Sequence, residues 1–203
     1  MCGTHGHRKD ETLTTRTHLL IMMPGTRSRV TDMPFSTELV RDFVNTFDVE
    51  TQADELSSPS ELALWLRERG LAGAHDHATD DDLRIAHELR ESLRAALRRE
   101  AADLPQLPLR VLVTPEEGPG LVPVADGVRG GLARIAAAVM TASWDRLKVC
   151  AEGTCQWAFI DSSKNRSRSW CSMRVCGNRT KTRAYRARKR GSRRPQGSNT
   201  DTV

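Results

Sequence analysis

Four cysteines near the C-terminal end constrain the fold of this 203-residue chain more than any other feature. They form two pairs with four residues inside each pair and fifteen residues between the pairs: Cys150, Cys155, Cys171 and Cys176. In a chain without a recognisable export signal, two such pairs are typical of a four-thiolate zinc site rather than of disulfides. Because four thiolates complete the tetrahedral shell of zinc and leave no position for water, we expect one structural Zn²⁺ per chain.

The alternative is that these cysteines are reduced and buried as small apolar side chains. Their surroundings are polar and rich in arginine, so too little apolar surface is available to bury all four. The fifth cysteine, Cys2, lies in a polar terminus with His5 and His7. We interpret it as an incidental thiol, and the two histidines as part of a disordered segment rather than a metal pair.

Charge is divided unevenly along the chain. Residues 1–160 carry 18 basic and 24 acidic side chains, whereas residues 161–203 carry 13 basic and 2 acidic ones. A basic end on an acidic body predicts a polyanionic partner, most often nucleic acid. No apolar run approaches the ~20 residues that cross a bilayer, so we expect a cytoplasmic protein without a membrane partner.

Composition and hydrophobic spacing predict four parts. We expect a disordered tail in residues 1–33, a helical α+β domain in 34–148, a zinc finger in 149–191 and a second disordered tail in 192–203. The first tail leaves the translation start open among four methionines: Met1, Met22, Met23 and Met33.

Within the α+β domain, helical spacing of apolar residues predicts helices in residues 35–47, 59–70, 80–102 and 128–148. Two β-branched runs predict a hairpin in residues 109–114 and 121–124. On the third helix the charged residues, Arg90 and Arg94 among them, are expected to face water.

In the finger we expect a tight turn at Gly153, a strand in residues 156–161, a second strand ending near Trp170 and a helix in 177–190. Four arginines on this helix recur at steps of four, three and four, which places them on one face: Arg179, Arg183, Arg186 and Arg190. Such a face can follow phosphates or enter a major groove. The remaining basic residues of the helix are interpreted as contacts to backbone phosphates: Lys181, Arg188 and Lys189.

Aromatic residues are interleaved with the basic ones: Trp157, Phe159, Trp170 and Tyr185. They could stack on the bases of RNA or single strands. A finger of about 45 residues has little core, so we favour burial of these rings around the metal. The alternative for the basic run itself is a solvated tail that touches RNA nonspecifically.

The segment from Trp170 to Arg179 contains the string Cys-Gly-Asn-Arg and, with the first cysteine pair, closely resembles the CGNR zinc finger. The body resembles the ABATE domain in residues 39–46, in the Pro59–Gly70 helix with Trp65, and in Leu89-Arg90. The resemblance implies a treble-clef-like finger that binds DNA, beside a helix-rich α+β domain that senses a small ligand. Proteins of this kind look like bacterial, stress-responsive transcription regulators.

The sequence displays no catalytic set, so we expect no enzyme. His75, His77 and His87 lack a companion nucleophile, and no phosphate-binding glycine loop is present. Asn45 and Arg90 lie beside apolar helix positions and match family landmarks, which makes them the candidates for a small-molecule effector pocket. Alternatively, Asn45 caps or turns the first helix and Arg90 forms a surface ion pair.

Taken together, these observations predict a zinc-dependent transcription regulator that binds double-stranded DNA and is associated with the nucleoid. The alternative is an RNA-binding or ribosome-associated accessory protein. A homodimer would suit paired DNA half-sites, although no heptad pattern marks one.

Overall fold

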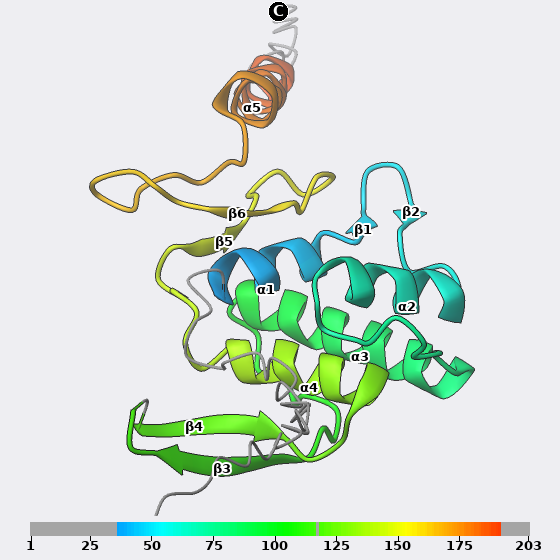
Figure 1. The fold of residues 1–203 in the computed structure, drawn as a ribbon. Helices are drawn as coiled ribbons and strands as arrows, with labels where there is room; N and C mark the ends of the chain where they lie inside the picture. Colours follow the sequence, from blue (N-terminus) through cyan, green and yellow to red (C-terminus); the bar gives the residue numbers. More distant parts are fainter. Residues whose placement is uncertain (1–35, 117, 192–203) are drawn as a thin grey trace, which may run out of the picture.

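The computed structural model describes residues 36–116 and 118–191 (Figure 1). Both expected tails, with Cys2, His5, His7 and the alternative start methionines, lie outside the described residues. The described chain is α+β, as predicted, with five α-helices, one short π-helix and three separate two-stranded antiparallel sheets. The elements follow in the order α1 (Ser36–Val44), β1 (Phe47–Asp48), β2 (Ala53–Asp54), α2 (Pro59–Glu68), α3 (Asp80–Leu97), β3 (Leu109–Thr114), β4 (Gly118–Pro123), α4 (Gly127–Ala138), β5 (Leu147–Val149), β6 (Ala158–Ile160), η1 (Met173–Gly177) and α5 (Asn178–Gly191).

Helices α1 to α4 form the body and enclose its core. Local sequence explains where two of them begin: the Ser58 hydroxyl accepts the Glu61 N–H at the start of α2, and Thr79 forms a capping box with Asp82 at the start of α3. The largest fully buried side chains come from all four helices and from the segments beside them: Val40, Phe43, Val44, Leu56, Leu62, Leu66, Leu89, Leu93, Leu132, Ile135 and Leu147. Burial of this apolar set is what holds the body together.

All four body helices end earlier than predicted: α2 ends at Glu68, and α1 ends at Val44, so that Phe47 lies in β1. Helix α3 stops at Leu97 because Arg99 adopts a left-handed φ of 68°, and the N–H groups of Arg99 and Glu100 return to the Ala96 and Ala95 carbonyls at 3.0 and 3.1 Å. This is a Schellman stop without a glycine. Helix α4 ends at Ala138 in a tight turn, and Leu147 lies in β5 instead of on a helix.

The charged face predicted for α3 is wrong at Arg90 and Arg94, which are 4% and 3% exposed. Arg90 forms a bidentate ion pair with Asp54 at 2.7 and 2.8 Å, and Arg94 donates to the carbonyls of Val44 and Phe47. Both arginines therefore fasten the short β1–β2 hairpin to α3, because each guanidinium group donates to a carboxylate or to backbone carbonyls there.

The predicted hairpin is present as β3 and β4, with Leu109 opposite Pro123 and Thr114 opposite Gly118, although β4 runs from Gly118 to Pro123 instead of over residues 121–124. It projects from the end of the body that lies opposite α5 (Figure 1). Val111 and Val113 are about two-thirds exposed, at 66% and 69%.

The strand predicted in the finger is β6, but its partner is β5, which precedes the first cysteine. No strand lies near Trp170 within the described residues. The chain curls there because the fully buried Asp161 carboxylate accepts the N–H groups of Ser163 and Arg168, at 2.9 and 3.0 Å, and the Lys148 ammonium at 2.6 Å. The ammonium hydrogen bond, aided by these amides, lowers the pKa of Asp161.

Candidate metal centre and nucleic-acid interface

The four predicted ligands come together at one point. The first pair lies in the turn between β5 and β6, and the second pair flanks the start of η1, which runs directly into α5. The four Sγ atoms lie within 4.8 Å of one another, and Cys171 Sγ is 3.7 Å from the Sγ atoms of both Cys155 and Cys176. A knuckle in a hairpin turn facing a second pair at a helix start is the arrangement of a treble clef.

This donor set fits zinc. Four sulfurs at ~2.3 Å from a tetrahedral Zn²⁺ are separated by about 3.8 Å, close to the observed spacing, whereas a disulfide needs about 2.05 Å. All four cysteines are free thiols. They would hold one Zn²⁺ in a closed shell, which supplies rigidity and no reactive position.

The surroundings of three of the cysteines shift the pKa values of their thiols in different directions. Burial raises the pKa of Cys155 to about 11 and raises the pKa of Cys171 as well. For Cys150, hydrogen bonds from the backbone of Cys171 and Glu152 outweigh burial and lower the pKa. A bound divalent cation would draw all four to the thiolate form.

Backbone hydrogen bonds shape the knuckle. Cys150 N–H donates to the Trp157 carbonyl at 2.9 Å, and Cys155 N–H donates to the Glu152 carbonyl at 2.9 Å. The turn expected at Gly153 is present, closed by this bond from Cys155 to Glu152, but the left-handed residue is Gln156, with φ 49°. Its side chain steadies this conformation by donating to the Gly153 carbonyl at 3.1 Å.

Glu152 is a site residue that sequence reasoning missed. Its carboxylate is fully buried inside the knuckle and accepts hydrogen bonds from Arg183 at 2.8 Å, Thr180 at 2.9 Å and Thr154 at 3.1 Å. The hydrogen bond from Arg183 outweighs burial and lowers the pKa of Glu152 to about 2. Glu152 thereby joins the zinc knuckle to the first turns of α5. A glutamate between two cysteines looks exposed in the sequence, so no local pattern could have found this role.

Helix α5 places its four regularly spaced arginines along one hollow of about 500 Å³, which Val175, Asn178 and Thr182 also line. The two nearer the zinc site have acidic partners: Arg179 lies 3.0 Å from Glu50 of the β1–β2 turn, and Arg183 contacts Glu152. Within the described residues, Arg186 and Arg190 have no acidic partner. Lys181, Arg188 and Lys189 lie outside this hollow on exposed positions of the same helix.

The aromatic residues do not share one role. Phe159 is buried, and Trp170 is half-buried with its indole N–H donating to Thr180 at 3.2 Å, so both support the finger. Trp157 and Tyr185 are 37% and 59% exposed, contrary to the expected burial.

The two effector-pocket candidates have structural partners. Asn45 clasps β6, because its amide donates to the Ala158 carbonyl at 2.9 Å and accepts the Ala158 N–H at 2.8 Å. It also borders a cleft between α1 and β6. Arg90 lies outside that cleft, in its ion pair with Asp54. His75 and His77 are exposed, and His87 bonds the Leu56 carbonyl through Nε2 at 2.9 Å.

Comparison with known proteins identifies the family of this chain. The profile of the family ABATE, described as "Putative stress-induced transcription regulator", matches residues 37–152, and the profile described as "CGNR zinc finger" matches residues 146–189. Neither is an enzyme family. No curated protein matches the chain. Among the described residues, no helix has the length and apolar character needed to cross a membrane. Since the first match covers more than half of the sequence and the second coincides with the cysteine cluster, the chain belongs to the ABATE family and carries a CGNR zinc finger.

Proposed function

We propose that this protein is a zinc-dependent transcription regulator whose helix α5 binds double-stranded DNA at the nucleoid, while the body senses a small ligand. The observation that carries the proposal is the hollow along α5, lined by four arginines. Helix α5 contains no acidic residue, and its side chains from Lys181 to Arg190 are exposed. A row of guanidinium groups at helical spacing suits the phosphates of a duplex, and bidentate arginine suits guanine.

The role of zinc in this proposal is to fix the position of α5. Held by the four cysteines, it would fix η1 and therefore the first turn of α5 against the knuckle. Rigid placement of the helix reduces the entropy lost on docking to a groove. The body also holds this helix in place, because the Glu50 carboxylate contacts Arg179.

The four arginines differ in whether they have an acidic partner, and we assign them different roles on this basis. Arg179 and Arg183 are already bonded to carboxylates, so a phosphate must compete with an internal ion pair at these positions. Arg186 and Arg190 face no such competition from the described residues. We therefore assign the main phosphate contacts to Arg186 and Arg190.

The test is a salt titration of duplex binding, followed by fluorescence anisotropy on zinc-loaded protein. The double variant Arg186→Ala/Arg190→Ala removes two phosphate contacts, so the slope of log K against log salt should fall by about 1.8. The matched control is Arg110→Ala, an exposed arginine on β3 at the far end of the body (Figure 1). An unchanged affinity and slope in the double variant would show that this face is not the contact surface.

Binding of single-stranded RNA is the second candidate, favoured by the exposed ring of Tyr185 on α5. Lys181 and Arg188 lie one turn away on either side, so a base stacked on the ring would have cationic neighbours. Competition between a labelled duplex and single-stranded RNA separates the two candidates. Equal competition by RNA, with both affinities reduced in Tyr185→Ala, would favour RNA. Selection from a random duplex pool that recovers a palindrome would favour DNA and a homodimer.

A further inference from the structure

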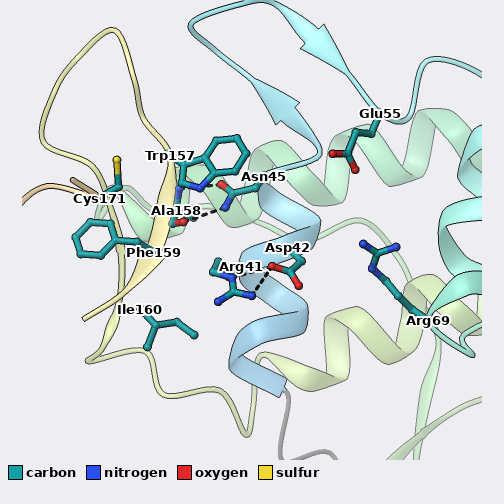
Figure 2. Close-up of a pocket in the computed structure, with 10 residues that line it drawn as sticks. All are labelled: Arg41, Asp42, Asn45, Glu55, Arg69, Trp157, Ala158, Phe159, Ile160 and Cys171. Atoms are coloured by element: carbon teal, nitrogen blue, oxygen red, sulfur yellow. Dashed lines mark hydrogen bonds and ion pairs between the residues drawn. The ribbon is translucent and has the colours of Figure 1, made fainter. Parts of the chain in front are cut away.

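A cleft of about 550 Å³ separates the body from the finger. Its walls come from α1 and the end of α2 on one side and from β6 on the other, and Cys171 borders it (Figure 2). We propose that this cleft binds a small zwitterion with an aromatic side chain, of the amino-acid type. The inference specifies the effector of the proposed regulator and rests on that function only for the consequence of binding.

Two opposite charges of the cleft, Arg69 and Glu55, do not meet, whereas Asp42 is paired with its neighbour Arg41 at 2.7 Å. Figure 2 shows Arg69 reaching from α2 toward α1, where Asp42 faces it, with Glu55 on the same side of the cleft. Among the described residues, the carboxylate of Glu55 has no hydrogen bond or ion pair, and Arg69 contacts neither Glu55 nor Asp42. Arg69 has an ion pair with its sequence neighbour Glu68, at 3.8 Å, and a ligand with charges of both signs could join Arg69 to Glu55.

Arg69 is held ready for a carboxylate. Its guanidinium lies 3.8 Å from the centre of the Trp65 ring, and one N–H donates to the Trp65 carbonyl at 3.2 Å. A guanidinium has five N–H donors, so a pair remains for bidentate binding of a carboxylate. Stacking on Trp65 reduces the rotamer entropy that binding would otherwise cost.

The remaining walls select the rest of the ligand. Trp157 is 37% exposed, and its indole has no hydrogen bond within the described residues, so a flat ring can pack against it. The unpaired carboxylate of Glu55 suits an ammonium group and disfavours a phosphate. A wholly apolar ligand is disfavoured as well, because it would desolvate the charges of Glu55 and Arg69 without pairing them.

Binding of a ligand in this cleft would affect the zinc site through β6. The Trp157 carbonyl accepts the N–H of the first zinc ligand, Cys150, at 2.9 Å, and the next residue is clasped by Asn45. A ligand that contacts both α1 and Trp157 therefore stabilises the junction of body and finger. Such a ligand should raise the melting temperature with concentration.

The test uses isothermal titration calorimetry on full-length, zinc-loaded protein. The probes are L-tryptophan, L-tyrosine and L-phenylalanine, together with two single-charge analogues of tryptophan: tryptamine, which lacks the carboxylate, and indole-3-propionate, which lacks the amine. We expect saturable binding of at least one amino acid. Because each lost charge leaves a cleft charge unpaired, the single-charge analogue should bind about tenfold more weakly.

Two variants locate the binding. Glu55→Gln should weaken amino-acid binding about tenfold, and Arg69→Gln should do the same. Glu88→Gln, an exposed glutamate on α3 outside the cleft, should leave it unchanged. Absence of binding by all three amino acids, equal binding of a single-charge analogue or of inorganic phosphate, or full binding by Glu55→Gln would overturn the proposal. Duplex binding measured without any probe tests α5 separately, so the two proposals can fail independently.

Discussion

Replacement of Asn45 by alanine should uncouple the finger from the body. The Asn45 amide makes two hydrogen bonds to the backbone of Ala158, at 2.8 and 2.9 Å, and Ala158 is fully buried. These are the bonds by which α1 holds β6. The variant leaves the buried N–H and the buried carbonyl of Ala158 each without its hydrogen-bond partner.

The structure sets the size of the effect. A buried backbone group left without a partner costs about 1–3 kcal/mol, so two such groups cost about 2–6 kcal/mol. The cleft beside Asn45 admits water to this edge of β6, which favours the lower half of that range. We therefore expect Asn45→Ala to destabilise the docked finger by about 3 kcal/mol.

Two probes in one urea titration measure this. Far-UV circular dichroism follows the helices of the body, and a chromogenic chelator follows zinc release from the finger. In the unchanged protein the two transitions should coincide, whereas in Asn45→Ala zinc release should move to lower urea and separate from helix loss. Asn165→Ala, an exposed asparagine in the loop after β6, is the matched control. Coincident transitions in Asn45→Ala, displaced by less than about 0.5 kcal/mol, would refute the reasoning.

Three further predictions concern the metal, an ion pair and the core. Cys176→Ser should reduce zinc content, measured by elemental analysis, from one per chain to nearly none and abolish duplex binding, while the helical signal of the body persists. Burial raises the pKa of Asp54, but the hydrogen bonds from Arg90 and the Leu56 N–H, with the charge of Arg90, together lower it below its ordinary 3.8; this pair therefore stabilises the fold above pH 3.8 and loses that contribution as pH falls through the lowered pKa. Asp54→Asn should therefore be less stable near pH 6 and show a smaller decline between pH 4 and 3, measured by urea midpoints. Leu89→Ala, at a fully buried position, should cost about 2–5 kcal/mol by the same titration, whereas Leu64→Ala, at 50% exposure, should cost under about 0.5 kcal/mol.

Local patterns predicted what depends on local chemistry. The cysteine spacing predicted a zinc site because two short pairs can close on one ion, and the sulfurs do gather. Ser58-Pro59 predicted the start of α2 because a hydroxyl cap and a proline at the first position both suit a helix start. The turn-rich link between two β-branched runs likewise predicted the β3–β4 hairpin.

Features that depend on distant partners were missed. Arg90 and Arg94 have the spacing of a solvated face, and they are buried only because the β1–β2 hairpin supplies a carboxylate and carbonyls. The end of α3 was missed for a local reason, because Arg99, not a glycine, takes the left-handed position. Glu152 was missed because its partners lie about 30 residues further along the chain, on α5.

The finger and the body share structure at their junction. The expected boundary between residues 148 and 149 falls inside β5, whose partner β6 lies beyond the first cysteine pair. The two family profiles overlap at residues 146–152, over the same strand and Cys150. On one side β6 pairs with β5, and on the other Asn45 holds it to α1. Because the zinc knuckle is the turn between these strands, a change at the α1 face of the cleft and a change at the metal act on the same few hydrogen bonds. The body is thus joined to the knuckle, and through it to the start of α5, by the β5–β6 pair.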